Sequence, residues 1–374
     1  MLAFYRKYRP KSFSDLVGQN EITQTLKNAA ASDKIAHSYL FYGPRGTGKT
    51  TTARILAKVV NCQTRLENKE FHQNGEPCNN CKACEDIDRG TALDVIEIDA
   101  ASNRGIDEIR TIKENIGLAP AYLTRKVFII DETHMLTKEA FNALLKTLEE
   151  PPQHICFVLA TTEREKIPAT IASRTQRFQF KKLSINKISE KLKAIALKEH
   201  IGVSQEALEV IAEASEGSLR DAESLLDQIV SFEGNNIEPQ DVEKILGQVG
   251  RKHITELTTH LLKNDLSQSL AYLNKLENDG YNLVQVNKDL IHYLRKILSL
   301  KLNRELINVF KNDLSSDELK KLEDHTLLVQ EKNHIGLIKS LIQAYSEMRY
   351  TPFVVVPLEI AIIENLTKPP PVFS

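Results

Sequence analysis

The sequence predicts a parallel α/β sheet with flanking helices, followed by a small helical domain and a second, all-helical domain. Short β-rich runs alternate with amphipathic helical patterns from about residue 37 to residue 180, which is typical of strands joined by crossover helices. The first run ends in a glycine-rich turn, where parallel α/β sheets commonly bind ligands. After Phe180 the strand pattern disappears and helical patterns continue. We therefore expect functional residues along the carboxyl edge of the sheet.

The length of 374 residues predicts several domains, because a single hydrophobic core rarely grows that large. We expect the α/β domain over residues 1–180, with a polar, cysteine-containing insertion at about 62–84. The small helical domain is expected over 181–242 and the all-helical domain over 243–368. Three prolines predict an extended tail over 369–374.

Charge and hydropathy limit the possible partners and location. Lys and Arg number 49 and Asp and Glu number 50, so the formal net charge is -1 and contact with a polyanion would depend on local patches or on an assembly. The longest apolar stretch, Phe353 to Ile363, contains Pro357 and Glu359 and is far shorter than the roughly 20 residues that span a bilayer. The basic N-terminus lacks the apolar region of an export signal. We expect a cytoplasmic protein with no membrane contact.

A phosphate-binding motif follows the first β-rich run. The motif G-x-x-x-x-G-K-[ST] is matched throughout, after the run SYLFY and before a predicted helix; its residues are Gly43, Pro44, Arg45, Gly46, Thr47, Gly48, Lys49 and Thr50. We also expect Thr51, which begins that helix, to bind the nucleotide. Glycines allow backbone amides to face one anion, Lys49 can neutralise β- and γ-phosphates, and Thr50 can offer a hydroxyl to Mg²⁺. The motif predicts a nucleoside-triphosphate site; the alternative is a glycine-rich turn with an incidental lysine.

Two further runs end in polar residues that would complete such a site. The run from Lys126 ends in Asp131 and Glu132, so Asp131 can hold Mg²⁺ through water and Glu132 can orient or deprotonate an attacking water. The run from Ile155 ends in hydroxyls, of which Thr162 is our choice for a γ-phosphate sensor. Alone, such residues are more often solvated turn residues or strand ends. After a phosphate-binding motif, they predict a hydrolase.

Four of the five cysteines form a compact pattern. Cys62, Cys78, Cys81 and Cys84 give C-x15-C-x2-C-x2-C, and four thiolates suit tetrahedral Zn²⁺. With four protein ligands there would be no open position for water, so the predicted zinc is structural; free thiols are the alternative. His72 is a conceivable substitute ligand. Cys156, in the middle of a β-rich run, is interpreted as a small buried apolar residue.

Longer segments resemble a known family. YRKYRPKSFSDLVGQ, GPRGTGKTTTARILAK, VFIIDETHMLTKEAFNALLKTLEEPP, LATTEREKIPATIASRTQRF and GSLRDAESLLDQ occur in the order found in clamp loaders. The chain resembles the gamma/tau family of bacterial DNA polymerase III subunits, which are AAA+ ATPases. These segments cover roughly the first 230 residues, and MRYTPFVVVPLEIAIIEN resembles the last helical region of the family's collar.

The resemblance implies roles for two arginines and for the helical domains. Arg174, in Ser173-Arg174-Thr175, matches the arginine finger that reaches a neighbouring subunit's ATP, although Thr175 stands where the family usually has cysteine. Arg220 matches the second sensor, on a lid helix that contacts the γ-phosphate. The small helical domain would be this lid and the all-helical domain an oligomerising collar; a monomeric helical cap is the alternative. The family also carries a cysteine module at this place.

The implied function is that of a motor subunit in a clamp loader, using ATP and Mg²⁺ to open a sliding clamp and load it onto primed DNA. Implied partners are delta- and delta-prime-type subunits, further copies of the chain, the sliding clamp and primer-template DNA. Polymerase and helicase would be reached only through a tau-type tail, which we do not expect within this sequence, and no polymerase active site is visible. Alternatives are an AAA+ helicase or helicase loader, or a non-hydrolysing structural loader subunit; Lys49, Thr50, Asp131 and Glu132 argue against the last.

Contact with DNA is a hypothesis that depends on local charge. The segment after the third run is basic, although such runs are usually solvated faces; it contains Arg174, Arg177, Lys181, Lys182, Lys187, Lys191 and Lys193. Arg104 precedes a predicted helix whose N-terminus could take a phosphate. We expect Arg104 and nearby amides to contribute to weak, sequence-independent contacts that sum over several subunits.

Overall fold

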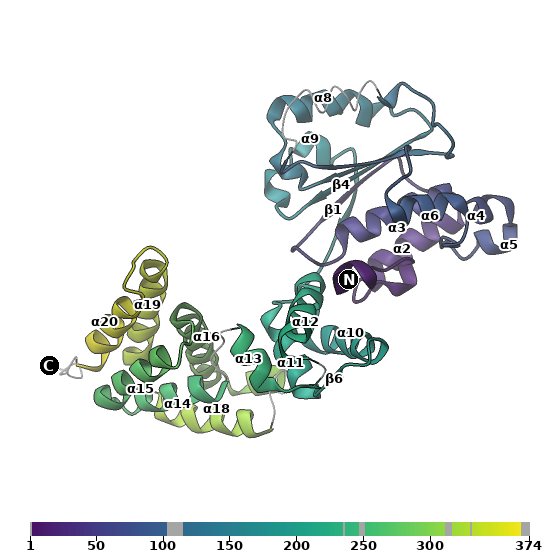
Figure 1. Ribbon diagram of the computed structural model, residues 1–374. Coiled ribbons are helices and arrows are strands. Elements are labelled where there is room, and N and C mark those ends of the chain that lie inside the picture. Colours follow the sequence, from purple (N-terminus) through teal and green to yellow (C-terminus); the bar gives the residue numbers. More distant parts are fainter. Residues whose placement is uncertain are drawn as a thin grey trace. The chain divides into compact units, whose positions relative to one another are not determined.

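The computed structural model describes residues 2–102, 115–234, 236–246, 251–310, 316–329 and 331–367. It divides into two compact units, residues 1–236 and 237–374 (Figure 1). Arg104 and the tail over 369–374 lie outside the described residues. The finer boundaries near residues 180 and 242 stay a prediction.

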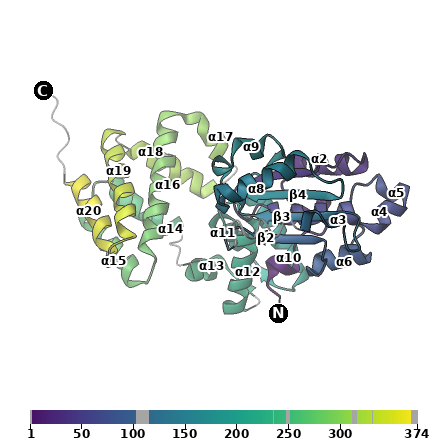
Figure 2. The ribbon, with the colours of Figure 1, turned by 90° about the horizontal axis from the view of Figure 1, so that it is seen from above.

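The first unit contains a five-stranded parallel sheet, which confirms the predicted α/β class. Its strands are β1 (Ser38–Tyr42), β2 (Val95–Asp99), β3 (Lys126–Asp131), β4 (Ile155–Thr161) and β5 (Gln176–Gln179), in the order β2-β3-β4-β1-β5. Figure 2 shows β2, β3 and β4 side by side. The sequence pattern predicted the first four strands but not β5. This strand lies at the sheet edge, pairs with β1 alone among the described strands, and has polar residues at three of its four positions.

Two layers of helices cover the sheet because its central strands alternate apolar side chains between both faces. Val127 and Ile129 pack toward one helical layer, whereas Phe128 and Ile130 pack toward the other. The first layer consists of α2 (Asn20–Ala31), α3 (Lys49–Asn61) and α6 (Lys82–Arg89). The second layer consists of α8 (Lys138–Glu149) and α9 (Ala169–Ala172), on the opposite side of the strands in Figure 1. Short elements before and between them are α1 (Phe4–Lys7), η1 (Phe13–Asp15), α4 (Gln63–Glu67), α5 (Lys69–His72), η2 (Thr133–Met135) and η3 (Arg164–Lys166).

A small helical region completes the first unit. Its elements are α10 (Ile185–Lys198), β6 (Gly202–Val203), α11 (Gln205–Ala214) and α12 (Leu219–Glu233). The start of α12 is fixed by Ser218, whose side-chain oxygen accepts a hydrogen bond from the backbone N–H of Asp221 at 3.3 Å. Gly217 precedes this cap at φ 88°, a left-handed conformation that favours glycine. This turn sets the positions of the first residues of α12, including Arg220.

The second unit is helical after the two-residue strand β7 (Asn236–Ile237). Its helices are α13 (Pro239–Leu246), α14 (Arg251–Leu262), α15 (Leu266–Asn278), α16 (Leu283–Leu302), η4 (Arg304–Leu306), α17 (Ile307–Phe310), α18 (Ser316–Leu328), α19 (Glu331–Met348) and α20 (Val355–Leu366). One apolar core, from Ile254 to Ile362, joins α14 and the helices that follow it. Apolar side chains are also exposed along α19, α20 and the turn between them, at Ile335, Ile342, Tyr350, Phe353, Val356, Ile360 and Ile363. Within the described residues, the helices are all too short or too polar to span a membrane.

Candidate nucleotide site and metal centre

The phosphate-binding loop lies between β1 and α3 in the conformation that its glycines allow. Gly43, Gly46 and Gly48 have φ values of 144°, 71° and 102°. A Cβ atom at Gly43 would lie 2.2 Å from the backbone oxygen of Phe180, and one at Gly46 would lie 1.8 Å from Ser218 Oγ. All three glycines therefore serve the backbone turn. Gly43 also permits the close approach of Phe180, and Gly46 that of the small helical region around α10 to α12, which we call the lid region. Gly48 directly precedes α3, so the N-terminal amides of that helix face the loop.

Lys49 is held within the loop rather than extended into solvent. Its side chain is buried at 6% exposure, and its Nζ donates hydrogen bonds to the backbone oxygens of Gly43 and Pro44, both at 2.8 Å. Burial lowers the pKa of Lys49, while the carboxylates of Glu132 and Asp131 act in the opposite direction. An ammonium group under this balance favours an additional anionic partner.

Three hydrogen bonds bring together the polar groups at the ends of three strand regions. Thr50 Oγ1 donates to Asp131 Oδ2 at 2.6 Å, and the backbone N–H of Glu132 donates to Asp131 Oδ1 at 2.9 Å. Thr162 Oγ1 donates to Glu132 Oε2 at 3.0 Å. Because β4 lies between β1 and β3, the residue after β4 lies beside the acid pair that ends β3. Glu132 itself adopts φ 45°, a conformation that is uncommon for a residue with a side chain and often occurs at functional sites.

His134 belongs to this cluster although the sequence pattern did not single it out. Its Nδ1 lies 3.0 Å from Thr161 Oγ1 and 3.4 Å from Glu132 Oε2, and its Nε2 lies 3.1 Å from Glu163 Oε1. The ring is nearly buried, at 6% side-chain exposure. A histidine two positions after a strand-end carboxylate could have been considered, but the chain has ten histidines and residue type alone gave no reason to choose this one.

A cavity of about 470 Å³ lies over the loop, between the sheet, the N-terminal segment and the lid region. The predicted residues that line it are Arg45, Gly46, Thr47, Gly48, Lys49, Thr50, Thr51, Asp131, Glu132 and Arg220. Gly43 and Pro44 contact the site through Lys49, and Thr162 contacts it through Glu132. Arg220 Cζ lies 5.0 Å from the ring centroid of Tyr5, so the lid arginine is stacked on the N-terminal segment.

Other residues that line this cavity were missed by the sequence analysis. They are Tyr5, Arg9, Pro10, Leu16 and Val17 of the N-terminal segment and Leu183, Leu219 and Glu223 of the lid region. Burial, together with the positive charges of Arg54, Arg220 and Arg6, lowers the pKa of Arg9. The basic and aromatic stretch YRKYRP could have indicated nucleotide binding, because such residues suit a nucleotide. It lies far from the loop in the sequence, so no local pattern placed the two in one site.

Arg174 lies beside the amino ends of the strands, whereas the loop follows the carboxyl end of β1. We call these two sides of the sheet its amino edge and its carboxyl edge. Its backbone oxygen accepts a hydrogen bond from Ser38 Oγ at 2.6 Å, and Ser38 begins the strand whose other end leads into Gly43. Five strand residues separate these points, or roughly 17 Å at the usual rise per residue. The guanidinium pairs with Glu149 and donates to the backbone oxygen of Thr170 at 2.8 Å, with 34% of its side chain exposed. Arg174 is therefore remote from the cavity of its own chain.

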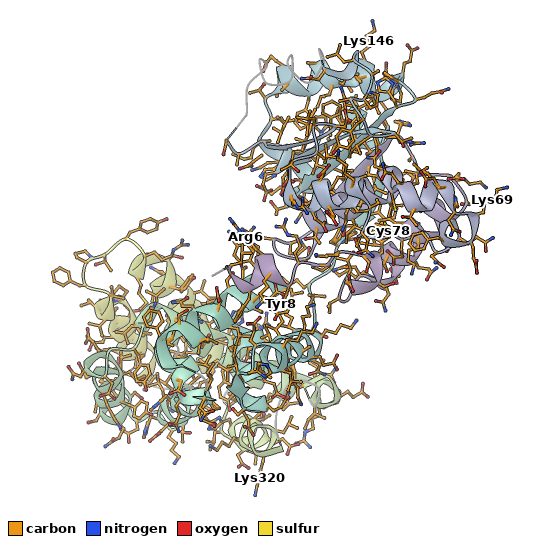
Figure 3. All side chains as sticks on the ribbon, turned by 45° about the vertical axis from the view of Figure 1, so that its right-hand side comes forward. Arg6, Tyr8, Lys69, Cys78, Lys146 and Lys320 are labelled. Atoms are coloured by element: carbon orange, nitrogen blue, oxygen red, sulfur yellow. The ribbon has the colours of Figure 1, made fainter. Side chains whose placement is uncertain are left out.

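The four predicted cysteines gather in the insertion between α3 and β2. The sulfur atoms of Cys62, Cys78, Cys81 and Cys84 all lie within 4.8 Å of one another. Backbone N–H groups of Cys78 and Cys81 donate to Cys62 Sγ and Cys78 Sγ, each at 3.3 Å. A hydrogen bond from Cys84, with others from nearby amides, lowers the pKa of the Cys62 thiol to about 5. Figure 3 labels Cys78 within this insertion.

Neighbouring residues support the four-cysteine assignment. His72 lies outside the cluster, with its Nε2 3.1 Å from Asp33 Oδ2 and 3.2 Å from Arg65. Cys156 is fully buried in β4, which agrees with its interpretation as a small apolar residue, and burial raises the pKa of its thiol to about 12.

The insertion is joined to the loop helix by a buried lysine. Lys58, on α3, is 1% exposed and its Nζ contacts Lys11 O at 2.8 Å, Asn79 Oδ1 at 2.7 Å and Asp88 Oδ1 at 2.8 Å. Asn79 lies between two of the cysteines. Since Lys11 belongs to the N-terminal segment, this one ammonium connects the cysteine module, the loop helix and the segment that lines the cavity.

The fold and the site together define a class of protein. The sheet is parallel, a phosphate-binding loop follows β1, an acid pair ends β3 and a helical lid lies over the cavity. This combination defines an AAA+ type of P-loop domain.

Comparison with known proteins identifies the family. Three family models match successive parts of the chain: "DNA polymerase III, delta subunit" over residues 18–184, "DNA polymerase III clamp loader subunit, ATPase lid domain" over 187–235, and "DNA polymerase III subunits gamma and tau domain III" over 237–370. The chain is 38% identical to the DNA polymerase III subunit gamma of Buchnera aphidicola subsp. Schizaphis graminum, covering 97% of both chains. The chain therefore belongs to the gamma/tau family of DNA polymerase III subunits, as its resemblance predicted.

Two other matches are more partial. The chain is 43% identical to the DNA polymerase III subunit tau of Bacillus subtilis over 97% of its own length, and it spans 62% of that relative. Among solved structures, the Thermotoga maritima RuvB Holliday junction branch migration motor matches with 19% identity and a TM-score of 0.47, over 73% of this chain and 85% of that one. The second likeness is too distant to bear on function.

Proposed function

We propose that this chain is an ATP-hydrolysing motor subunit of a bacterial DNA polymerase III clamp loader, in which ATP binding and hydrolysis drive the opening and loading of a sliding clamp onto primed DNA. The observation that carries the proposal is the meeting of Lys49, Thr50, Asp131 and Glu132 at one cavity, beside a lid arginine. A non-hydrolysing structural subunit would not need this complete set. Such a role in replication belongs in the bacterial cytoplasm.

The chain's own groups have distinct tasks in this proposal. Loop amides and Lys49 bind the β- and γ-phosphates of ATP. Thr50 and Asp131 would hold Mg²⁺, because their oxygens are hard ligands that already lie 2.6 Å apart. When bound, the metal supplies positive charge to the phosphates. Glu132 orients or deprotonates the attacking water, and Thr162 fixes the Glu132 carboxylate and acts as a γ-phosphate sensor.

Two arginines link hydrolysis to changes in the assembly. Arg220, at the start of α12, contacts the γ-phosphate from the lid and makes lid position depend on the bound nucleotide. Arg174 acts on the ATP of a neighbouring subunit, because its place at the far edge of the sheet excludes its own cavity. Each site is thus completed by another chain.

The cysteine module is proposed to hold a structural Zn²⁺. Four sulfurs within 4.8 Å of one another, two of them buried, fit the tetrahedral thiolate set that this metal favours. Bound zinc would fix the insertion in place. Its neighbours Asn79 and Lys58 would then hold the loop helix and the N-terminal segment in register.

The proposed partners are other loader subunits of delta and delta-prime type, further copies of this chain, the sliding clamp and primer-template DNA. The exposed apolar side chains along α19 and α20 support a collar that joins subunits, since isolated exposed residues are common but a sustained row along two helices suits an interface. Contact of Arg104 with DNA remains a hypothesis.

The test is the steady-state ATPase rate with partner subunits, sliding clamp and primed DNA. We expect strong stimulation when clamp and DNA are both present, and its loss in Lys49→Ala. Lys146→Ala is the control, because Lys146 is an exposed lysine on α8 that points to solvent (Figure 3). Stimulation without the clamp would indicate a helicase or helicase loader, and absence of hydrolysis would indicate a structural subunit.

A further inference from the structure

Glu223 presents a buried, incompletely paired carboxyl group to the nucleotide cavity. Its residue exposure is 5%, and among the described residues its Oε1 has no hydrogen-bond partner. Removing a carboxyl oxygen from water without a partner is costly. No step proposed above uses this group, so its retention in the cavity wall calls for a ligand that satisfies it.

The position of Glu223 along the cavity indicates which part of a nucleotide it would meet. The phosphates are bound at the loop and at the N-terminus of α3, so the base must extend toward the remaining walls. Those walls include Tyr5 and Arg9 together with four apolar side chains that suit the faces of a purine ring. The four, which we call the apolar end of the cavity, are Leu16, Val17, Leu183 and Leu219. Glu223 follows Leu219 by four residues on α12 and therefore lies on the same face of the helix. It is a polar group within the apolar end of the cavity.

We propose that Glu223 is a specificity residue that reads the base, accepting a hydrogen bond from the 6-amino group of adenine. This inference rests on the proposed binding of ATP. A carboxyl oxygen can accept from an exocyclic amino group, whereas a purine without that group would leave the oxygen unpaired in an apolar wall. Sites that hydrogen-bond a substrate group discriminate strongly against an analogue that lacks it, for this reason.

The charges around Glu223 do not already satisfy it. Lys191 of α10 and Arg9 of the N-terminal segment are close enough to favour its ionised form. Among the described residues, neither donates a hydrogen bond to its Oε1. Burial is the stronger influence and raises the pKa of Glu223 to about 7. The oxygen can accept a hydrogen bond from the base in either protonation state.

The experiment compares the affinities of the full chain for ATP and for purine riboside triphosphate, which has the same ring system without the 6-amino group. Both are measured by displacement of a fluorescent ATP analogue in the presence of Mg²⁺. We expect the native chain to prefer ATP by tenfold or more, as a hydrogen bond to a carboxylate is worth about 1.5 to 3 kcal/mol. Glu223→Leu should bring the two affinities close together, mainly by weakening ATP. Glu223→Gln should keep most of the preference, because its amide oxygen still accepts.

The matched control is Asp227→Asn, one turn further along α12 and not among the residues that line the cavity; it should leave the ratio unchanged. Equal affinities in the native chain would overturn the assignment, and this comparison needs no variant to fold. A native ratio retained in Glu223→Leu would also overturn it. Failure of the chain to bind either triphosphate would overturn the proposed function and this inference together, so the two kinds of failure are distinguishable.

Discussion

The carboxyl edge of the sheet holds a cavity lined by Lys49, Asp131 and Glu132, whereas the amino edge presents a partly exposed Arg174 paired with Glu149. The cysteine module also lies toward the amino edge. Asn61, the last residue of α3, accepts a hydrogen bond from the backbone N–H of Arg125, which directly precedes β3, and Cys62 follows Asn61. The groups proposed to bind and hydrolyse ATP are therefore separated from the arginine proposed to assist hydrolysis. In a parallel sheet the carboxyl ends of the strands meet at one edge and the amino ends at the other, separated by the length of the strands. In this account a residue at the amino edge therefore acts on the site at the carboxyl edge of another chain, not of its own.

The largest expected effect concerns Arg174. Arg174→Ala should leave ATP affinity of the chain within about twofold of the native value, because the residue lies across the sheet from the cavity. Hydrolysis in the assembled loader should fall by about 10³, the order expected for loss of an arginine finger. Nucleotide binding and ATPase rates measure the two effects separately. Lys146→Ala, which removes an exposed cation on α8, is the control. A large loss of ATP affinity in Arg174→Ala would contradict the claim that Arg174 takes no part in the nucleotide site of its own chain.

The second prediction separates structural from chemical roles. Cys78→Ser should reduce bound zinc and lower the free energy of unfolding by on the order of 3 kcal/mol or more, because metal binding is coupled to folding of the insertion. Molecules that still bind ATP should hydrolyse it at close to the native rate. Metal analysis, denaturant titration and ATPase assays measure these three quantities. Cys156→Ala should keep full zinc content, and a zinc loss equal to that of Cys78→Ser would count against the four-cysteine site.

The third prediction concerns the pH dependence of stability at the apolar end of the cavity. Burial raises the pKa of Glu223 from its ordinary 4.5 to about 7. Between these values the unfolded chain ionises before the folded chain does, so this group's contribution lowers the free energy of unfolding as pH rises from about 4.5 to about 7. Each pKa unit corresponds to about 1.4 kcal/mol, which gives a total on the order of 3 kcal/mol.

Glu223→Gln removes this ionisation. The quantity to compare is the free energy of unfolding of the variant minus that of the native chain. This difference should be larger at pH 8 than at pH 5 by on the order of 2 kcal/mol. Denaturant titrations at the two pH values measure the difference. Asp227→Asn should show little change of this kind. A difference that is the same at pH 5 and pH 8 would show that burial of Glu223 does not disfavour its charge.

The smallest expected effect concerns His134 at the carboxyl edge. His134→Ala should lower kcat about tenfold with KM for ATP within twofold, because the ring contacts the Glu132 and Glu163 carboxylates and would position the former. His134→Gln should recover part of kcat by restoring a hydrogen bond to Thr161 or Glu163. His154→Gln, just before β4 at the amino edge, is the control. A change confined to KM, or no recovery with glutamine, would argue against a positioning role.

Local motifs predicted much of this architecture. The loop from Gly43 to Thr50 and the acid pair after β3 could be predicted because each depends on a short segment at a strand end. The grouping of the cysteines could be predicted because four of them lie close together in the sequence. In the structure Thr50 contacts Asp131, and the four sulfurs gather in one place.

Features assembled from distant or weakly patterned segments could not be predicted in this way. Strand β5 was not predicted because three of its four residues are polar, as an edge strand allows. The shared cavity wall of Arg9 and Glu223 was not predicted because the two residues are more than 200 positions apart and line one cavity only in the folded chain. The place of His134 in the site was not predicted because its contacts depend on the direction of its side chain after the unusual backbone turn at Glu132.

The most direct test of the account is a mixing experiment with two defective chains. Lys49→Ala cannot bind ATP productively but keeps its finger, whereas Arg174→Ala binds ATP but offers none. Assembled separately with partner subunits, clamp and primed DNA, each should show little stimulated hydrolysis. Assembled together, they should recover part of it, because the finger of the first chain serves the ATP of the second. Absence of any recovery in mixed assemblies that form normally would contradict a site shared between chains.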